Sequence, residues 1–112
     1  MKNLLLIISL LFFFSACTTI DENVELSISQ ENLIEVSIRD SQFNPNDIVI
    51  EKGTTVKWTN YDSQGHTVTI ENLFDSKTIT KGKSFSYTFN EVGEFEYECK
   101  IHQDIKGVII VQ

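Results

Sequence analysis

The sequence predicts an all-β domain, a β-sandwich or barrel of about seven short strands. From Leu33 to the end of the chain, apolar residues alternate with polar ones, which is the period of a half-buried strand. Turn-forming residues separate these runs at regular spacing, and no stretch carries a capped helical stripe. The apolar positions are, in order, Val36 and Ile38; Ile48 and Ile50; Val56 and Trp58; Val68 and Ile70; Phe85, Tyr87 and Phe89; Phe95, Tyr97 and Cys99; and Val108 to Val111.

Each expected strand is bounded by residues that break regular structure. Glycine, proline and asparagine favour turns, so a cluster of them between two alternating runs marks a connection. These clusters are Asn44-Pro45-Asn46, Lys52-Gly53, Ser63-Gln64-Gly65, Lys81-Gly82 and Val92-Gly93.

The last alternating run has one aromatic face and one acidic face. Phe95, Tyr97 and Cys99 fall on one side of the strand, because side chains alternate along it. Glu94, Glu96 and Glu98 fall on the other side, so we expect them to face water. Cys99 is then the last inward-pointing residue, at one end of the sandwich.

Length and composition exclude several classes of protein. The chain has 112 residues, which allows one domain and excludes a Rossmann or multidomain enzyme. Its net charge of −7 argues against nucleic-acid binding, which requires a cationic face. A hydrophobic fraction of 41% with 11% aromatic residues argues against disorder.

The first sixteen residues have the layout of a secretory signal peptide. Lys2 precedes an apolar run from Leu4 to Phe14, and the small residues Ser15 and Ala16 follow it. Eleven residues span only ~17 Å as a helix, whereas a bilayer core is about 30 Å thick. We therefore expect residues 1–16 to be an export signal rather than a membrane span.

The segment from Phe14 to Cys17 resembles a bacterial lipobox, in which the cysteine becomes the lipidated first residue. This resemblance implies an exported protein, on the periplasmic or cell-surface side, that Cys17 anchors to a membrane by its lipid. The alternative is cleavage nearby, which leaves Cys17 as an ordinary thiol. Residues 17–32 are expected to be a polar tether, and residues 33–112 to be the folded domain.

Three side chains are candidate metal ligands. His66, Cys99 and His102 are the strong soft or borderline donors of the expected domain. The Cys-x-x-His spacing of Cys99 and His102 is by itself a weak signal, and a lone histidine such as His66 is more often a loop residue. The case improves because both segments lie at the ends of expected strands, which a sandwich can bring together.

Two longer motifs resemble the cupredoxins, the small blue copper proteins, and are most similar to the amicyanin and plastocyanin branch. The resemblance covers about 80 residues. Its first half is Phe43-x-Pro45-x-x-Ile48-x-Ile50-x-x-Gly53-x-x-Val56-x-Trp58-x-Asn60, followed by Gly65-His66-Thr67-Val68. Its second half is Gly93-x-Phe95-x-Tyr97-x-Cys99-x-x-His102-x-x-Ile105-x-Gly107-x-Ile109-Ile110-Val111.

The resemblance implies a Greek-key β-sandwich of seven to eight strands and a copper ion held by His66, Cys99 and His102. It implies a type 1 copper protein that carries single electrons and is not an enzyme. Asn60 or Thr67 is expected to support the ligand loop through hydrogen bonds.

The chain departs from the family pattern at the axial ligand. The short ligand loop of amicyanin-like proteins ends in a weakly bound methionine, whereas this chain has Ile105 there, which cannot coordinate. We therefore expect a three-coordinate site. Loss of an axial donor destabilises Cu(II) relative to Cu(I), so the reduction potential should be high for the family.

By analogy with the family, the edge of His102 is the port through which electrons pass to a redox protein partner. Ile101 and Ile105 are expected to form part of an apolar docking patch, with Lys100, Asp104 and Lys106 on its rim. The acidic surface would steer a basic partner. The protein is expected to be a monomer.

The main alternative is a copper-handling lipoprotein that buffers or delivers Cu(I). Zinc also accepts a Cys-His-His ligand set, so zinc binding in vitro would not decide the function. A nucleophilic enzyme built on Cys99 and His102 is disfavoured, because the sequence offers no oxyanion-binding arrangement.

Overall fold

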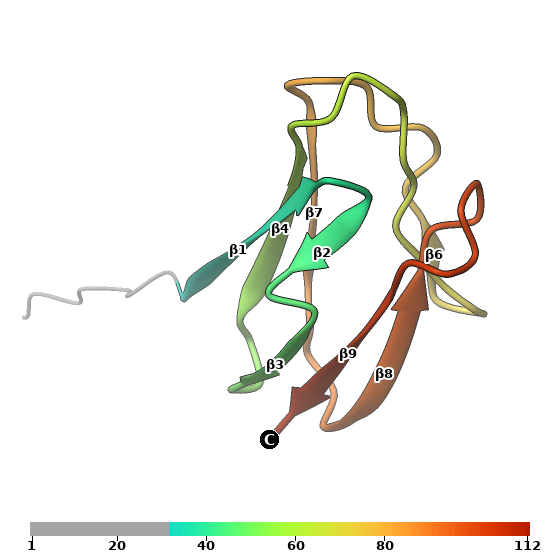
Figure 1. Ribbon diagram of the computed structural model, residues 1–112. Coiled ribbons are helices and arrows are strands. Elements are labelled where there is room, and N and C mark those ends of the chain that lie inside the picture. Colours follow the sequence, from blue (N-terminus) through green and yellow to red (C-terminus); the bar gives the residue numbers. More distant parts are fainter. Residues whose placement is uncertain (1–31) are drawn as a thin grey trace, which may run out of the picture.

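The computed structural model describes residues 32–112, which form two β-sheets packed face to face (Figure 1). The expected signal peptide (1–16), the lipidation site Cys17 and all but the last residue of the expected tether (17–32) lie outside the described residues. Residues 32–112 contain no helix with the length and apolarity that a membrane span requires.

The first sheet has four strands in the order β2-β1-β4-β7. These strands are β1 (Leu33–Arg39), β2 (Gln42–Asn44), β4 (Thr55–Asn60) and β7 (Ser84–Thr88). β1 pairs with β4 in parallel, and the other neighbours are antiparallel.

The second sheet has five strands in the order β3-β9-β8-β5-β6. These strands are β3 (Asp47–Ile50), β5 (Thr69–Ile70), β6 (Phe74–Asp75), β8 (Gly93–Glu98) and β9 (Lys106–Val111). β3 pairs with β9 in parallel, and the other pairs are antiparallel.

The predicted all-β sandwich is confirmed, but the described residues contain nine strands rather than seven or eight. The additional strands are β2 and β6, of three and two residues. Neither strand falls within one of the alternating apolar runs, so the period-two pattern did not mark them.

The core lies between the two sheets and is rich in aromatic rings. Trp58 of β4 is fully buried, and its ring lies 5.6 Å from that of Tyr97 in β8, which belongs to the opposite sheet. Phe74 of β6 likewise packs on Phe85 of β7, with ring centroids 5.1 Å apart. Aromatic pairs at these separations stabilise the contact beyond the area that they bury.

β8 has the two faces that the sequence predicts. Tyr97 is buried in the core and Phe95 packs against it, whereas Glu94 and Glu96 are exposed and Glu98 is half-buried. β8 ends at Glu98, so Cys99 is the first residue of the connection to β9. In Figure 1 this connection and the one that follows β4 both lie at the end of the sandwich away from the C-terminus.

Candidate metal centre

His66 is a buried histidine on the connection between β4 and β5. Its side chain has no exposed surface. Its backbone pairs with Ile79: the His66 N–H donates to the Ile79 carbonyl at 3.2 Å, and the Ile79 N–H donates back at 2.7 Å. These two bonds hold the backbone of His66 against the segment that carries Ile79.

Cys99 is a free cysteine with no exposed surface. Its N–H donates to the Ile105 carbonyl at 3.0 Å, which closes the connection between β8 and β9. Its Sγ accepts the Thr67 N–H at 3.3 Å and lies 3.8 Å from His66 Nδ1. Thr69 in β5 pairs with Glu98 in β8. This pairing brings Thr67 and His66, just before β5, close to Cys99, just after β8.

His102 lies on the same connection, three residues after Cys99, and is half-buried. Its ring centroid is 5.2 Å from that of His66, with the two ring planes inclined at 57°. The Ile105 N–H donates to the His102 carbonyl at 3.0 Å. The fold therefore brings His66, Cys99 and His102 together from segments that are 33 residues apart in sequence.

The His66–Cys99 pair has the separation that a shared metal ion requires. With zinc-like bonds of about 2.3 Å to sulfur and about 2.1 Å to nitrogen, two ligands about 120° apart lie about 3.8 Å from each other. Among residues 32–112, no group of three or more His, Cys, Asp and Glu side chains is arranged to hold a metal ion as placed. His102 is thus a neighbour of the pair rather than part of a completed ligand set.

Thr67 supports both ligand segments, as the sequence predicts. Its N–H donates to Cys99 Sγ, and its Oγ1 accepts the Lys100 N–H at 2.8 Å. The second bond holds the backbone immediately after the cysteine.

Asn60 supports the loop that carries His66. It is fully buried, and its Nδ2 donates to the carbonyls of Gln64 and Ile79, at 2.9 and 2.8 Å. Its Oδ1 accepts the Asp62 N–H at 2.8 Å. The amide group therefore binds this loop at Asp62 and Gln64 and also binds Ile79, the residue that pairs with the His66 backbone.

Asp62 is a functional candidate that sequence reasoning missed. Its Oδ2 lies 2.9 Å from His66 Nε2, and its two oxygens also accept the N–H groups of Asp40 and Ser41, at 2.8 and 2.9 Å. Burial acts to raise the pKa of Asp62, but the hydrogen bonds from Ser41, Asp40 and His66 outweigh it and hold the pKa below its ordinary value. The sequence signal that could have indicated this contact is the position of Asp62, four residues before His66.

Ile105, the residue expected at the axial position of the family pattern, is buried, with 6% of its surface exposed. Its backbone bonds to both Cys99 and His102, so its position relative to these two candidate ligands is well defined. The expectation that Ile105 contributes to an exposed apolar patch is wrong, because its side chain belongs to the hydrophobic core. Ile101 is 51% exposed, as expected for a patch beside His102.

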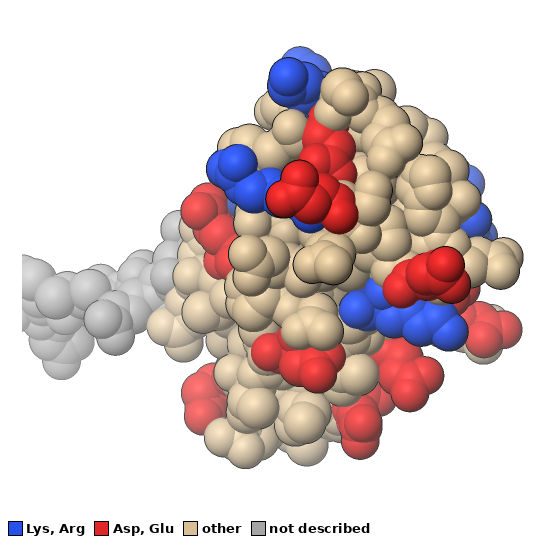
Figure 2. All heavy atoms as spheres, viewed as in Figure 1, with Lys and Arg blue, Asp and Glu red and all other residues tan. Residues whose placement is uncertain are grey.

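The charged rim predicted around the ligand loop is exposed. Lys100, Asp104 and Lys106 all lie at the surface. Lys100 Nζ lies 3.1 Å from Asp75 Oδ2, which links the ligand loop to β6. On the face seen in Figure 2, acidic side chains are spread among basic ones rather than gathered in one block.

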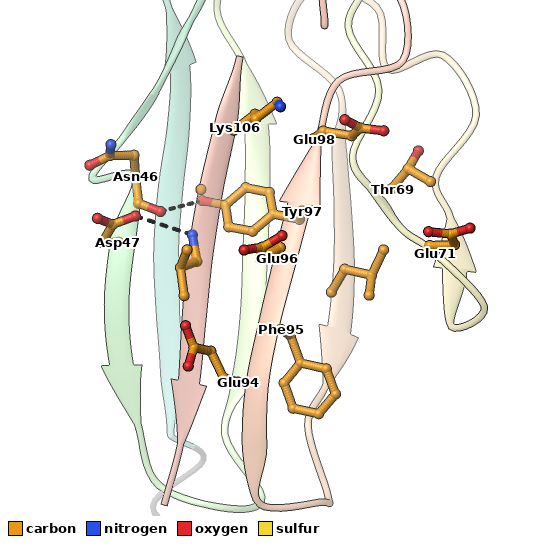
Figure 3. Close-up of a pocket in the computed structure, with 13 residues that line it drawn as sticks. Asn46, Asp47, Thr69, Glu71, Glu94, Phe95, Glu96, Tyr97, Glu98 and Lys106 are labelled. Atoms are coloured by element: carbon orange, nitrogen blue, oxygen red, sulfur yellow. Dashed lines mark hydrogen bonds between the residues drawn. The ribbon is translucent and has the colours of Figure 1, made fainter. Parts of the chain in front are cut away.

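A shallow hollow lies on the five-stranded sheet, away from the three candidate ligands (Figure 3). Its lining includes Asp47, Glu71, Glu94, Glu96 and Glu98, with Lys106 as its one basic group. None of the candidate ligands lines it. The hollow offers carboxylates but no thiolate or imidazole. A metal such as copper prefers those softer donors, which His66 and Cys99 provide.

The chain is similar in sequence to amicyanins. It is 29% identical to the amicyanin of Paracoccus versutus over 85 residues, which are 70% of this chain and 64% of that protein. The chain thus spans less than two thirds of the length of that relative. It is 27% identical over 84 residues to amicyanin-alpha of Methylorubrum extorquens, covering 70% of this chain and 71% of that protein.

Solved amicyanin structures have the same fold. The crystal structure of Paracoccus versutus amicyanin superposes with a TM-score of 0.67 at 26% identity, covering 72% of this chain and 82% of that chain. A mutant amicyanin in its reduced Cu(I) form superposes with a TM-score of 0.69 at 26% identity, covering 71% and 82%. The family model for the cupredoxin-like domain matches residues 4–111, and the chain therefore belongs to the cupredoxin-like family.

Proposed function

We propose that this chain is a membrane-anchored type 1 copper protein that acts as a one-electron carrier and not as an enzyme. The proposed ligands are His66, Cys99 and His102. The observation that carries the proposal is the buried Cys99 Sγ, which accepts the Thr67 N–H and lies 3.8 Å from His66 Nδ1. Copper, when bound, supplies a one-electron Cu(II)/Cu(I) couple.

The protein environment suits electron transfer because the two buried ligands are held by the fold. His66 is fixed through the Ile79 backbone and Cys99 through Ile105 and Thr67. Rigidly held ligands keep the geometry similar in both oxidation states, and this keeps the reorganisation energy small. His102, which is half-buried, is the proposed route between the site and a redox protein partner.

The burial of Cys99 also favours a carrier over a nucleophilic enzyme. Its side chain has no exposed surface, so its sulfur offers a substrate no direct access. A thiol that acts as a nucleophile is usually partly exposed in an electropositive setting. The Cys99 thiol instead faces an imidazole and a backbone N–H.

We propose that Ile105 leaves the site without an axial side-chain ligand. An isoleucine side chain has no lone pair, and this one packs in the core. A trigonal His₂Cys site that lacks the usual weak axial thioether favours Cu(I), so the reduction potential is expected to be high.

The test is an optical and EPR titration of the exported protein carrying Cys17→Ser, which prevents lipid attachment. Cu(II) is added first and a chemical oxidant second, because a high-potential site holds colourless Cu(I). An intense thiolate-to-copper band that appears on oxidation and disappears in Cys99→Ser supports the electron carrier. Tight Cu(I) binding without that band supports Cu(I) buffering or delivery instead. Absence of copper binding contradicts both functions.

The proposed export and lipid anchor rest on residues 1–17 and have a separate test. Mass spectrometry of the protein from a bacterial membrane fraction should find an acylated Cys17 as the first residue. Cys17→Ser should abolish the acylation. Wild-type protein that begins elsewhere and carries no lipid would contradict the anchor without affecting the copper site.

A further inference from the structure

The two ring nitrogens of His66 face two different groups. Nε2 lies 2.9 Å from Asp62 Oδ2, and Nδ1 lies 3.8 Å from Cys99 Sγ. An ionised carboxylate only accepts hydrogen bonds, and a neutral imidazole carries one hydrogen. The Asp62 contact therefore selects the tautomer with hydrogen on Nε2, which leaves the Nδ1 lone pair directed at the sulfur side.

The Asp62 carboxylate is itself held in place from a distant part of the chain. It accepts the N–H groups of Asp40 and Ser41, which form the turn between β1 and β2. Both turn residues have positive φ angles, 52° and 57°. Asn60 holds the backbone of Asp62 through the Asp62 N–H. The carboxylate is therefore fixed by contacts other than the one with His66.

We propose that Asp62 is a positioning residue that locks His66 in the Nε2–H tautomer and directs Nδ1 toward the metal. The inference rests on the proposed copper site and adds the group that orients one of its ligands. A carboxylate hydrogen-bonded to a ligating imidazole raises the basicity of the ligand, and its loss typically costs about 10- to 100-fold in metal affinity.

The competing interpretation is that Asp62 only closes the β1–β2 turn. Both roles predict a loss of stability in Asp62→Ala, so stability alone does not separate them. Asp62→Asn is the milder variant: its single amide oxygen can still accept from His66 and Ser41, but the negative charge is lost and its NH2 group replaces the oxygen that accepts the Asp40 N–H. A matched control is Gln64→Ala, which removes the 2.9 Å bond from Gln64 Nε2 to Ser41 Oγ and leaves the His66 contact intact.

The first measurement is the ¹⁵N NMR tautomer of His66 in the metal-free Cys17→Ser protein near pH 7.5. Wild type, Asp62→Asn and Gln64→Ala should show the Nε2–H tautomer, and Asp62→Ala should show a mixture or the Nδ1–H form. An Nδ1–H tautomer in wild type, or an unchanged tautomer in Asp62→Ala, would overturn the proposal. This readout needs no metal, so it is separate from the test of the copper function.

The second measurement is Cu(I) affinity by competition with a chromophoric chelator. Asp62→Ala should bind about 10- to 100-fold more weakly than wild type, Asp62→Asn should be intermediate, and Gln64→Ala should match wild type. Equal losses in Asp62→Ala and Gln64→Ala would assign the effect to the turn and overturn the proposal. If Asp62→Ala does not fold, Asp62→Asn must still bind Cu(I) more weakly than Gln64→Ala does, and wild-type affinity in Asp62→Asn would contradict the role.

Discussion

The backbone N–H of Thr67 donates to the sulfur of Cys99 at 3.3 Å, joining two segments that are 32 residues apart in sequence. The hydroxyl of the same threonine accepts the Lys100 N–H at 2.8 Å. Thr67 thus contacts the candidate ligand Cys99 through its backbone and the next residue, Lys100, through its side chain. The backbone contact acts on the sulfur, and the side-chain contact supports the loop. A substitution of the side chain can therefore change the second contact and keep the first.

We expect Thr67→Val to loosen the loop without removing the hydrogen bond to the sulfur. The substitution keeps the side-chain shape but leaves the Lys100 N–H without its acceptor, which costs about 1–3 kcal/mol of unfolding free energy. Chemical denaturation measures this cost, and hydrogen exchange at Lys100 reports the lost bond directly. Thr67→Ser keeps the hydroxyl and is expected to stay closer to wild type. Equal stability of Thr67→Val and wild type would contradict the supporting role.

Ile105→Met should lower the reduction potential of the copper-loaded protein. A thioether near the metal donates weakly to Cu(II) and stabilises it relative to Cu(I). Ile105→Leu is the matched control, because it has similar volume and no donor atom. A redox titration monitored through the visible band measures both variants. Equal potentials in the methionine and leucine variants would show that residue 105 does not reach the axial position.

Gly107→Ala should destabilise the domain more than Gly53→Ala. A Cβ at position 107 would collide with the Asn46 carbonyl and the Tyr97 ring, and Tyr97 is only 1% exposed and cannot move aside easily. Overpacking at such a site is expected to cost about 3 kcal/mol or more.

At Gly53 a Cβ would meet nothing within 4 Å, so the cost is limited to strain at φ +94°. We expect about 1–2 kcal/mol for it. Thermal unfolding of the two variants measures the difference. A smaller loss in Gly107→Ala than in Gly53→Ala would contradict the close packing of Tyr97 over β9.

Tyr97 should make the domain less stable at high pH. Burial raises the pKa of Tyr97 above its ordinary value, and the negative charge of Asp47 adds to this shift. Because the unfolded phenol ionises near pH 10 and the folded one does not, its contribution to stability is complete below about pH 10 and declines as the pH rises above it.

Denaturation midpoints between pH 8 and pH 11.5 test this, with Tyr97→Phe as the control. The phenylalanine variant should lose about 1 kcal/mol at neutral pH, because the Tyr97 hydroxyl donates to the Asn46 carbonyl at 3.0 Å. It should also show a weaker decline above pH 10. If wild type and Tyr97→Phe lose stability in parallel above pH 10, ionisation of Tyr97 is not the cause of the decline.

The sequence was most informative where side-chain alternation decides which face a residue occupies. Tyr97 and Cys99 are both buried and Glu94 and Glu96 are both exposed, as the period of two predicts. The same pattern did not reveal β6, because Phe74 and Asp75 are not part of an alternating apolar run. The expectation that Ile105 lies in an exposed patch came from the family analogy and not from the period, and it failed because Ile105 packs in the core.

The sequence by itself determined the all-β class, the inward face of β8 and the three candidate ligands. These follow from residue types and short-range spacing, which are properties of single strands and loops. Only the tertiary structure decided that His66 Nδ1 lies 3.8 Å from Cys99 Sγ and that Asp62 joins His66 to the turn at Asp40 and Ser41. Those contacts depend on the pairing of β5 with β8 and on the path of a loop, and linear spacing carries no information about either.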